Sequence, residues 1–414
     1  MQPFFHSLLS INNSESKEVT PELDSLAYTW FGRPNYAASD VAQKYWIGST
    51  KDTESGTTQH ITEYDMVLDT FTSTQVGSLY NKDDHNQSQI LIRESDKRLI
   101  VFYTEHVGSA VNYRISINPL DSSAFGVEKT IASTPDSSYA SPYQASNGNI
   151  FVFWRYTPVT IQEEWWYSKS TDGGVTFGTP VKLYETGVRA YLITNQLNDA
   201  IHFIASDGHP QTNFGLLVNN YHFKFNLLTE VATDSVGSVI TLPLVPANLT
   251  PIYTSSNNDT SWILDITTKN NLPRVLYLVY PDGMINDTIT KQLWYAEFNG
   301  LIWTNKQLIS TTMVGYIEKD DVIGEYAYSG ASRFDTTNPD IIWMPKQVDD
   351  ILEIHKVDLS INPIYIEQIT FNSTVDNWRP ISVNSSKYNL LWLRNNSYIS
   401  FLDFNITLMA KTVN

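Results

Sequence analysis

The chain of 414 residues contains no cysteine, which excludes disulfide frameworks, thiolate metal sites and cysteine nucleophiles. It also has no run of 18 apolar residues, so we expect no membrane insertion. Its first residues lack the basic and long apolar stretches of a secretory signal peptide. Helical periodicity is nearly absent as well. These absences leave a β-rich protein as the expectation.

Positive charge is scarce, with 27 Lys and Arg against 44 Asp and Glu, a formal net charge of −17 and a sequence pI of about 4.8. This balance argues against nucleic acid as a partner, because phosphate binding needs a basic surface. The same field repels acidic glycans at long range, so an acidic substrate would need local Arg, Lys or His. The aromatic share of 13% suits strands and carbohydrate surfaces equally.

Short apolar runs rich in β-branched and aromatic residues recur between Gly, Asn, Asp and Pro turns. Their interval is roughly the ~40–50 residues typical of propeller blades, and a polar turn and a second strand follow each run. A β-sandwich would lack this longer period. The runs are residues 99–103, 150–154, 200–204, 275–280, 340–343 and 390–393.

We predict an all-β fold: a single seven-bladed β-propeller of four-stranded antiparallel blades over residues 23–414. Residues 1–22 are expected to form a flexible N-terminal extension. N-terminal residues, with Ala27 to Phe31 as the candidate segment, are expected to close the last blade, because closure removes exposed sheet edges. We expect the protein to be a monomer.

A nearly complete Asp-box, the turn signature of many propellers, spans Ser170 to Phe177 with the sequence STDGGVTF. Gly173 and Gly174 permit positive φ, and Asp172 can accept hydrogen bonds from turn N–H groups. Phe177 is expected to fill the space between sheets. We interpret this motif as a structural turn between the outer strands of one blade.

Sequons for N-glycosylation occur at nine asparagines. Their density fits an extracellular, virion-surface or cell-surface protein, although an Asn-rich chain also produces such triplets by chance. A glycan on Asn86 would crowd the polar cluster described next. The nine positions are Asn12, Asn86, Asn248, Asn258, Asn286, Asn372, Asn384, Asn395 and Asn405.

Polar residues that could supply an acid, a base and an anion clamp follow one another between positions 83 and 155. Asp83-Asp84-His85-Asn86 comes first, and His106, Tyr139 and Arg155 follow. Each also has a structural reading, as a solvated loop, a strand-end histidine or one of 24 tyrosines. Arg155 follows an apolar strand directly, which is a good place for a charge that faces a cleft.

In this order the segments resemble the seven-bladed propeller polysaccharide lyases that cleave ulvan. The likeness covers most of residues 80–404, and a wider set of propellers with BNR repeats shares much of the scaffold. The segments that carry it are 83–86, 102–106, 113–116, 139–142, 153–156, 170–177, 201–203, 207–210, 264–266, 272–275, 294–300, 328–331, 338–340 and 378–380.

The resemblance implies β-elimination at a uronate, in which Arg155 neutralises the carboxylate. Tyr139 would be the acid toward O4, or both base and acid on one face of the sugar. His85 would be the base or the partner of Tyr139 across the ring, and His106 would hold or polarise the site. No cofactor is required for this chemistry. The expected substrate contacts are Asp84, Asn86, Arg189, Tyr191 and His209.

His202, His209 and His222 form a second histidine cluster in the sequence. Three imidazoles could bind a structural metal ion such as Zn²⁺, and Ca²⁺ is a further candidate. The alternative is that they are loop and core histidines with separate partners.

Two other functions fit parts of the sequence. A non-catalytic glycan-binding propeller, such as a virion or cell-surface adhesin, suits the sequon-dense composition. A sialidase-type hydrolase is suggested by the Asp-box, but Arg33 lies in a poor match to the N-terminal arginine motif of sialidases. The first choice remains a lyase with an acidic polysaccharide as its partner.

Overall fold

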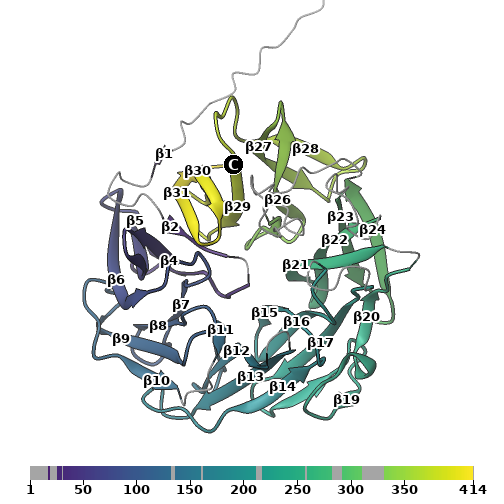
Figure 1. Ribbon diagram of the computed structural model, residues 1–414, viewed down its shortest axis with the longest axis horizontal. Helices are drawn as coiled ribbons and strands as arrows, with labels where there is room; N and C mark the ends of the chain where they lie inside the picture. The colour runs from purple at the N-terminus through teal and green to yellow at the C-terminus, as the bar shows by residue number, and fades with distance from the viewer. Residues whose placement is uncertain are drawn as a thin grey trace, which may run out of the picture.

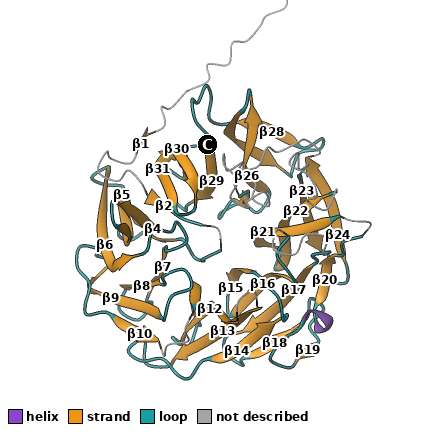
Figure 2. Ribbon diagram, in the orientation of Figure 1, coloured by secondary structure: helices purple, strands orange, loops and turns teal. Residues whose placement is uncertain are grey.

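The computed structural model describes residues 17–18, 26–29, 31–131, 136–159, 162–210, 217–256, 259–281, 291–309 and 331–413. These residues form seven antiparallel sheets arranged as a ring around a central axis (Figure 1). The predicted all-β, seven-bladed propeller is therefore confirmed. Figure 2 shows one short helical turn, η2 (Pro246–Asn248), among the described residues. No helix in the described ranges is long and apolar enough to cross a bilayer.

Blades one to three follow the chain from the inner strand outward. Blade one has an interrupted inner edge that pairs with its second strand, and blades two and three have four strands each. The strands of blade one are β2 (Leu26–Ala27), β3 (Tyr36–Ser39), β4 (Lys44–Thr53), β5 (Gly56–Asp65) and β6 (Thr70–Tyr80). Those of blade two are β7 (Ser88–Ile92), β8 (Arg98–Tyr103), β9 (Val111–Pro119) and β10 (Lys129–Ile131). Those of blade three are β11 (Ser137–Gln144), β12 (Ile150–Val159), β13 (Gln162–Ser170) and β14 (Val181–Glu185).

Blade four is enlarged to six strands, whereas blades five and six have four each. The strands of blade four are β15 (Leu192–Leu197), β16 (Ala200–Ser206), β17 (Asn220–Asn226), β18 (Val231–Thr233), β19 (Val239–Ile240) and β20 (Thr250–Tyr253). Blade five has β21 (Thr260–Lys269), β22 (Leu272–Tyr280), β23 (Gln292–Phe298) and β24 (Trp303–Ile309). Blade six has β25 (Arg333–Phe334), β26 (Ile341–Val348), β27 (Ile351–Asp358) and β28 (Tyr365–Gln368).

The last blade joins the two ends of the chain. It consists of β29 (Asn377–Ser382), β30 (Leu390–Ser400), β31 (Asp403–Lys411) and, at its outer edge, β1 (Lys17–Glu18). Lys17 pairs with Ala410, and Glu18 pairs with Met409. The predicted closing segment was therefore wrong, because Leu26 and Ala27 pair with β4 in blade one. Of the predicted extension over residues 1–22, only residues 17–18 lie within the described ranges.

Large aromatic side chains fill the space within and between the blades. Most blades contribute a tryptophan that is almost fully buried, and the fully buried set includes Trp46, Trp154, Trp165, Trp262, Trp378 and Trp392. Such rings bury a large apolar area with few side-chain torsions to fix. This packing leaves polar residues at the strand ends, where the functional site is found.

The Ser170–Phe177 turn joins β13 to β14, the outer strands of blade three, as expected. Asp172 accepts bonds from the N–H and the Oγ1 of Thr176 at 2.9 and 2.6 Å. Ser170 donates to Asp172 and accepts from the N–H of Gly174. The ring of Phe177 packs edge-on against two aromatic rings of blade two, so the turn fastens neighbouring blades.

One end of the ring axis holds a cavity of about 470 Å³. Residues from the inner strands of all seven blades line it, among them Arg333 on β25, together with Arg33, which precedes β3. On the inner strands of blades three and seven these residues follow those of the polar site described below, as Tyr143 follows Tyr139 on β11. The axial cavity and the polar site therefore lie toward opposite ends of the inner strands.

We expect Asp172→Ala to lower the free energy of unfolding by about 1 kcal/mol, because it removes the acceptor of several turn hydrogen bonds. Asp172→Asn, which keeps one oxygen acceptor, should cost less. Thermal or urea unfolding followed by circular dichroism measures both. Equal stability of Asp172→Ala and the parent protein would show that the turn is dispensable.

Candidate active site

The Asp83–Asn86 segment connects β6 of blade one to β7 of blade two. The carboxylate of Asp83 accepts a 2.8 Å bond from the backbone N–H of His85, so a local Asx-type turn sets the segment. All four side chains are at least nine-tenths buried. The solvated loop that the sequence alone also allowed is therefore excluded.

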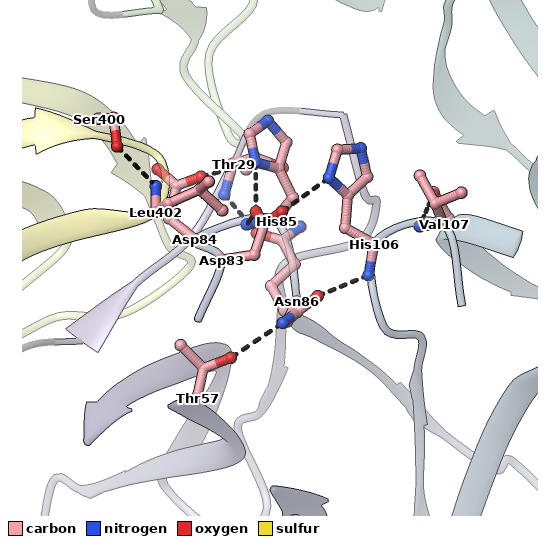
Figure 3. Close-up of polar contacts among 12 residues, drawn as sticks. Thr29, Thr57, Asp83, Asp84, His85, Asn86, His106, Val107, Ser400 and Leu402 are labelled. Carbon is pink, nitrogen blue, oxygen red and sulfur yellow. Dashed lines mark hydrogen bonds and ion pairs between the residues drawn. The ribbon is translucent and has the colours of Figure 1, made fainter. Parts of the chain in front are cut away.

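Two imidazole rings share the carboxylate of Asp83 (Figure 3). Nδ1 of His85 lies 2.7 Å from Oδ1, and Nδ1 of His106 lies 2.8 Å from Oδ2. The rings stack at 4.6 Å between centroids with 15° between their planes. Both Nδ1 atoms are engaged with protein groups, so Nε2 is the nitrogen through which either ring can act on a ligand or a further partner.

The two histidines carry different charges near neutral pH. Burial would lower the pKa of His85, but the carboxylates of Asp84 and Asp83 raise it well above 6.5. Burial lowers the pKa of His106 to about 4, against the opposing effect of Asp83 and with the help of His85 and Arg155. His85 is therefore an imidazolium while His106 is neutral. Because Nη2 of Arg155 donates to Nε2 of His106 over 3.1 Å, the proton of His106 sits on Nδ1.

Tyr139 reaches the site through a β-bulge in β11. The register with β12 shifts between Ser138 and Ser141, and Tyr139 has a φ of 58°. A left-handed conformation costs a non-glycine residue roughly 1–3 kcal/mol, and such bulges are frequent where a side chain must be redirected. The ring centroid of Tyr139 lies 6.0 Å from His85 and 5.8 Å from His106.

Arg155 projects from β12 and is almost fully buried. Its guanidinium lies over the rings of Tyr139 and Tyr191, at 4.6 and 5.0 Å from their centroids. Nη1 lies 3.4 Å from Oε1 of Glu163, a buried carboxylate on β13. The same oxygen is 3.0 Å from Nε of Arg189, so one glutamate holds two arginines.

These contacts extend into a continuous series of eight polar groups, from blade seven to the connection between blades three and four. Successive pairs in this series lie within 3.4 Å of each other. Counting His106 as neutral, four cations and three anions give a local charge of +1 (4 − 3). Although the protein as a whole is acidic, this site therefore carries the local positive charge that an acidic ligand requires. The order is Arg379, Asp84, His85, Asp83, His106, Arg155, Glu163 and Arg189.

Two residues that we expected to contact substrate, Asp84 and Asn86, are instead buried beneath the site. Asp84 is fully buried between His85 and Arg379. Asn86 is also fully buried, where it donates to Thr57 and accepts from the N–H of His106. Both residues therefore hold the histidines of the site in place: Asp84 contacts His85, and Asn86 contacts His106. Burial also removes Asn86 from the surface that a glycan would need.

Tyr191 and His209, two further expected substrate contacts, lie beside Arg155 and Arg189. Their ring centroids are 5.5 Å apart, and His209 packs at 4.6 Å against Trp262 of blade five. Phe31 joins them with its centroid 4.5 Å from that of Tyr191. Burial, together with Arg189 and Arg155, lowers the pKa of His209 well below 6.5. The result is an aromatic wall beside the two guanidinium groups.

The three histidines proposed for a metal do not converge. His202 and His222 are hydrogen-bonded to each other over 3.1 Å in blade four, whereas His209 belongs to the aromatic wall. Within the described ranges, the one group of three side chains spaced for a metal is Asp83, His85 and His106. Their hydrogen bonds place ring protons between nitrogen and carboxylate, so we interpret this group as an acid–base centre.

Sequence reasoning missed Glu163, Arg379 and Tyr398. Glu163 had no distinguishing neighbour in the sequence, and its role depends on the pairing of β12 with β13. Arg379 stands in the Trp-Arg-Pro segment that was noted only for its likeness to a family. Tyr398 lies 314 positions from Asp84, which it meets at 2.9 Å, and only ring closure brings such residues together.

Comparison with solved structures supports the fold. The chain superposes on the structure of an ulvan lyase of polysaccharide lyase family PL25 with a TM-score of 0.67 and 15% identity, covering 96% of both chains. A second PL25 structure, bound to -[GlcA(1-4)Rha3S]-, gives a TM-score of 0.65 at 16% identity and covers 96% and 94% of the two chains. The polysaccharide lyase Uly1 gives 0.59 at 11% identity and covers 96% and 91%.

Curated relatives match a shorter segment. An ulvan lyase of Alteromonas sp. (strain LOR) and one of Pseudoalteromonas sp. (strain PLSV) are each 30% identical over 114 residues. In both cases the match covers 24% of this chain and 22% of the relative's length.

A family model matches a larger part of the chain. It is described as a BNR repeat-containing family member, and it matches residues 35–310. This range begins in blade one, ends beside β24 of blade five and includes His85, His106, Tyr139 and Arg155. With two thirds of its length matched by that model, and with seven blades around one axis, the chain belongs to the BNR repeat-containing family.

Proposed function

We propose that the protein is a polysaccharide lyase that cleaves a uronic-acid-containing, ulvan-like polysaccharide by β-elimination. The observation that carries this proposal is the convergence of His85, Tyr139 and Arg155 on one site, although they come from three separate segments of the chain. The ulvan lyases among its relatives and structural neighbours support the same substrate class.

Arg155 binds and neutralises the uronate carboxylate. Abstraction of the C5 proton places negative charge on that carboxylate, and a fixed guanidinium stabilises the enolate-like state. Glu163 and the ring faces of Tyr139 and Tyr191 hold the guanidinium before substrate arrives. Little reorganisation is then needed during the reaction.

The charge of His85 favours one of its two proposed roles. An imidazolium has no free lone pair for the C5 proton, but it can donate a proton from Nε2 to the departing O4. Tyr139 accepts the C5 proton on its phenolic oxygen while its own hydroxyl proton passes to solvent. The C5–H and C4–O4 bonds break, the C4–C5 double bond forms, and solvent returns a proton to His85.

Neutral His106 has a supporting task. Its Nε2 accepts from Arg155 while its Nδ1 donates to Asp83, so it connects the guanidinium to the acid–base pair. Arg189 is one-third exposed and shares Glu163 with Arg155, which suits it to a second anionic group on the glycan. The local charge of +1 offsets the repulsion of the acidic chain at short range.

We expect Arg155→Lys to lower kcat/KM on ulvan by about 10²-fold or more, because a point charge cannot reproduce the planar guanidinium that contacts His106 and the two tyrosine rings. Tyr139→Phe should lower it by about 10²–10⁴-fold through loss of proton transfer. The near-ultraviolet absorbance of the 4,5-unsaturated uronate product measures the rate. Arg98→Lys, at a half-exposed arginine of blade two, is the matched control and should retain full activity.

No absorbance rise on ulvan or on a panel of other uronate glycans would contradict the proposal. If such a protein still bound glycan, the alternative of a non-catalytic binding propeller would replace it. Circular dichroism of each variant separates loss of chemistry from loss of folding.

The pH dependence of kcat/KM should be bell-shaped. Activity requires neutral His106, so it should fall as the pH drops through about 4, where that ring gains a proton. Activity also requires protonated His85, so it should fall on the alkaline side, at a pH well above 6.5. Initial rates across buffers of constant ionic strength test both limbs. A rate that rises as His85 loses its proton would assign this ring the role of base.

A further inference from the structure

Asp84 is held on all sides by groups that come from the closing blade and from His85. Its Oδ1 lies 2.8 Å from Nδ1 of His85, while its Oδ2 accepts from Arg379 and from Tyr398, each at 2.9 Å. Its backbone N–H donates to the carbonyl of Phe401 at 2.9 Å. Asp84 is fully buried, so it cannot contact a substrate and can act only through its neighbours.

Arg379 is fixed by backbone geometry as well as by charge. It occupies a bulge in β29, where the register with β30 shifts between Trp378 and Ile381, and it has a φ of 48°. Its Nη1 also donates to the carbonyl of Tyr28 at 2.9 Å, which ties β29 to the segment after β2. Arg379 is 2% exposed, and its Nη1 is engaged by both the Asp84 carboxylate and the carbonyl of Tyr28.

Asp83 alone cannot explain why the two stacked imidazoles differ. It gives one oxygen to His85 and the other to His106 at nearly equal distances of 2.7 and 2.8 Å. Asp84 contacts only His85, and Arg155 contacts only His106. His85 therefore has a second carboxylate beside it, whereas His106 has a guanidinium. This difference makes His85 the ring that carries the positive charge.

We propose that Arg379 and Asp84 form a positioning pair that orients His85 and keeps it charged. Arg379 comes from blade seven, the blade that closes the ring, whereas Asp84 belongs to the same segment as His85. The consequence for catalysis rests on the proposed lyase function, but the effect on His85 does not. Arg379 stabilises the Asp84 carboxylate, which in turn stabilises the imidazolium. Burial would raise the pKa of Asp84, whereas Arg379 and His85 lower it, so the carboxylate stays ionised.

Within the part of the chain that the structure describes, five residues face His85. Asp83 and Asp84 belong to its own segment, His106 stacks on it, and Tyr139 approaches from blade three. Phe401, between β30 and β31, meets it edge-on at 5.4 Å and carries no charge. Arg379 of blade seven thus acts on His85 through Asp84.

The test is a pH titration of His85 by NMR in protein labelled at histidine, with the resonance assigned by its absence in His85→Gln. In Asp84→Asn, His85 should lose its proton at a lower pH than in the parent protein. The double variant Asp84→Asn/Arg379→Gln should show a smaller shift in the same direction, because it removes a near anion together with a more distant cation. This variant also leaves no buried guanidinium without its carboxylate, which protects folding.

Tyr398→Phe is the matched control. It removes one hydrogen bond to the same oxygen of Asp84 but no charge, so His85 should titrate as in the parent protein. For the lyase reaction, Asp84→Asn should lower kcat on the order of tenfold at neutral pH, move the alkaline limb to lower pH and leave KM unchanged.

An unchanged titration of His85 in both Asp84 variants would overturn the positioning role, whether or not the protein cleaves ulvan. A shifted titration in a protein without lyase activity would retain the positioning role and reject the proposed function. Retention of the full pH–rate profile in Asp84→Asn would also contradict the pair, because a merely structural residue leaves the alkaline limb in place.

Discussion

The site depends on one carboxylate, that of Asp83, which lies between two stacked imidazoles. Two cations stacked at 4.6 Å in a buried position would repel each other strongly, and two neutral rings would leave a buried anion without compensation. A single positive charge on the pair of rings satisfies both conditions. The neighbours of each ring then determine which of them carries that charge, because Asp84 contacts His85 and Arg155 contacts His106.

Backbone irregularity places the remaining groups. The inner strands of blades three and seven each contain one extra residue, and each bulge puts a non-glycine residue, Tyr139 or Arg379, at positive φ. Regular strands would direct these side chains according to the alternation of the sheet. The bulges direct them toward the stacked histidines instead. Tight packing of Tyr139 and the hydrogen bonds of Arg379 offset the conformational cost.

Much of this architecture could be predicted from the sequence, because the blade period, the turn residues and the Ser170–Phe177 motif are local signals. The closing strand could not, since β1 contributes only two residues and has no pattern of its own. The convergence of His85, His106, Tyr139 and Arg155 agrees with the predicted set. Glu163 and Arg379 could not be found, because their roles depend on strand pairing across the ring. The burial of Asp84 and Asn86 has the same origin, since packing from other blades excludes solvent.

The contacts of Asp84 impose an order on the biogenesis of the site. The aspartate is synthesised early, whereas the arginine and the tyrosine that hold it come from positions 379 and 398, near the C-terminal end of this sequence. A nascent chain with five or six blades therefore contains His85, His106, Tyr139 and Arg155 without the completed charge arrangement. The contacts around His85 are complete only after translation has reached the last blade and the ring has joined. Premature termination within that blade thus produces an incomplete site even though all four residues are present.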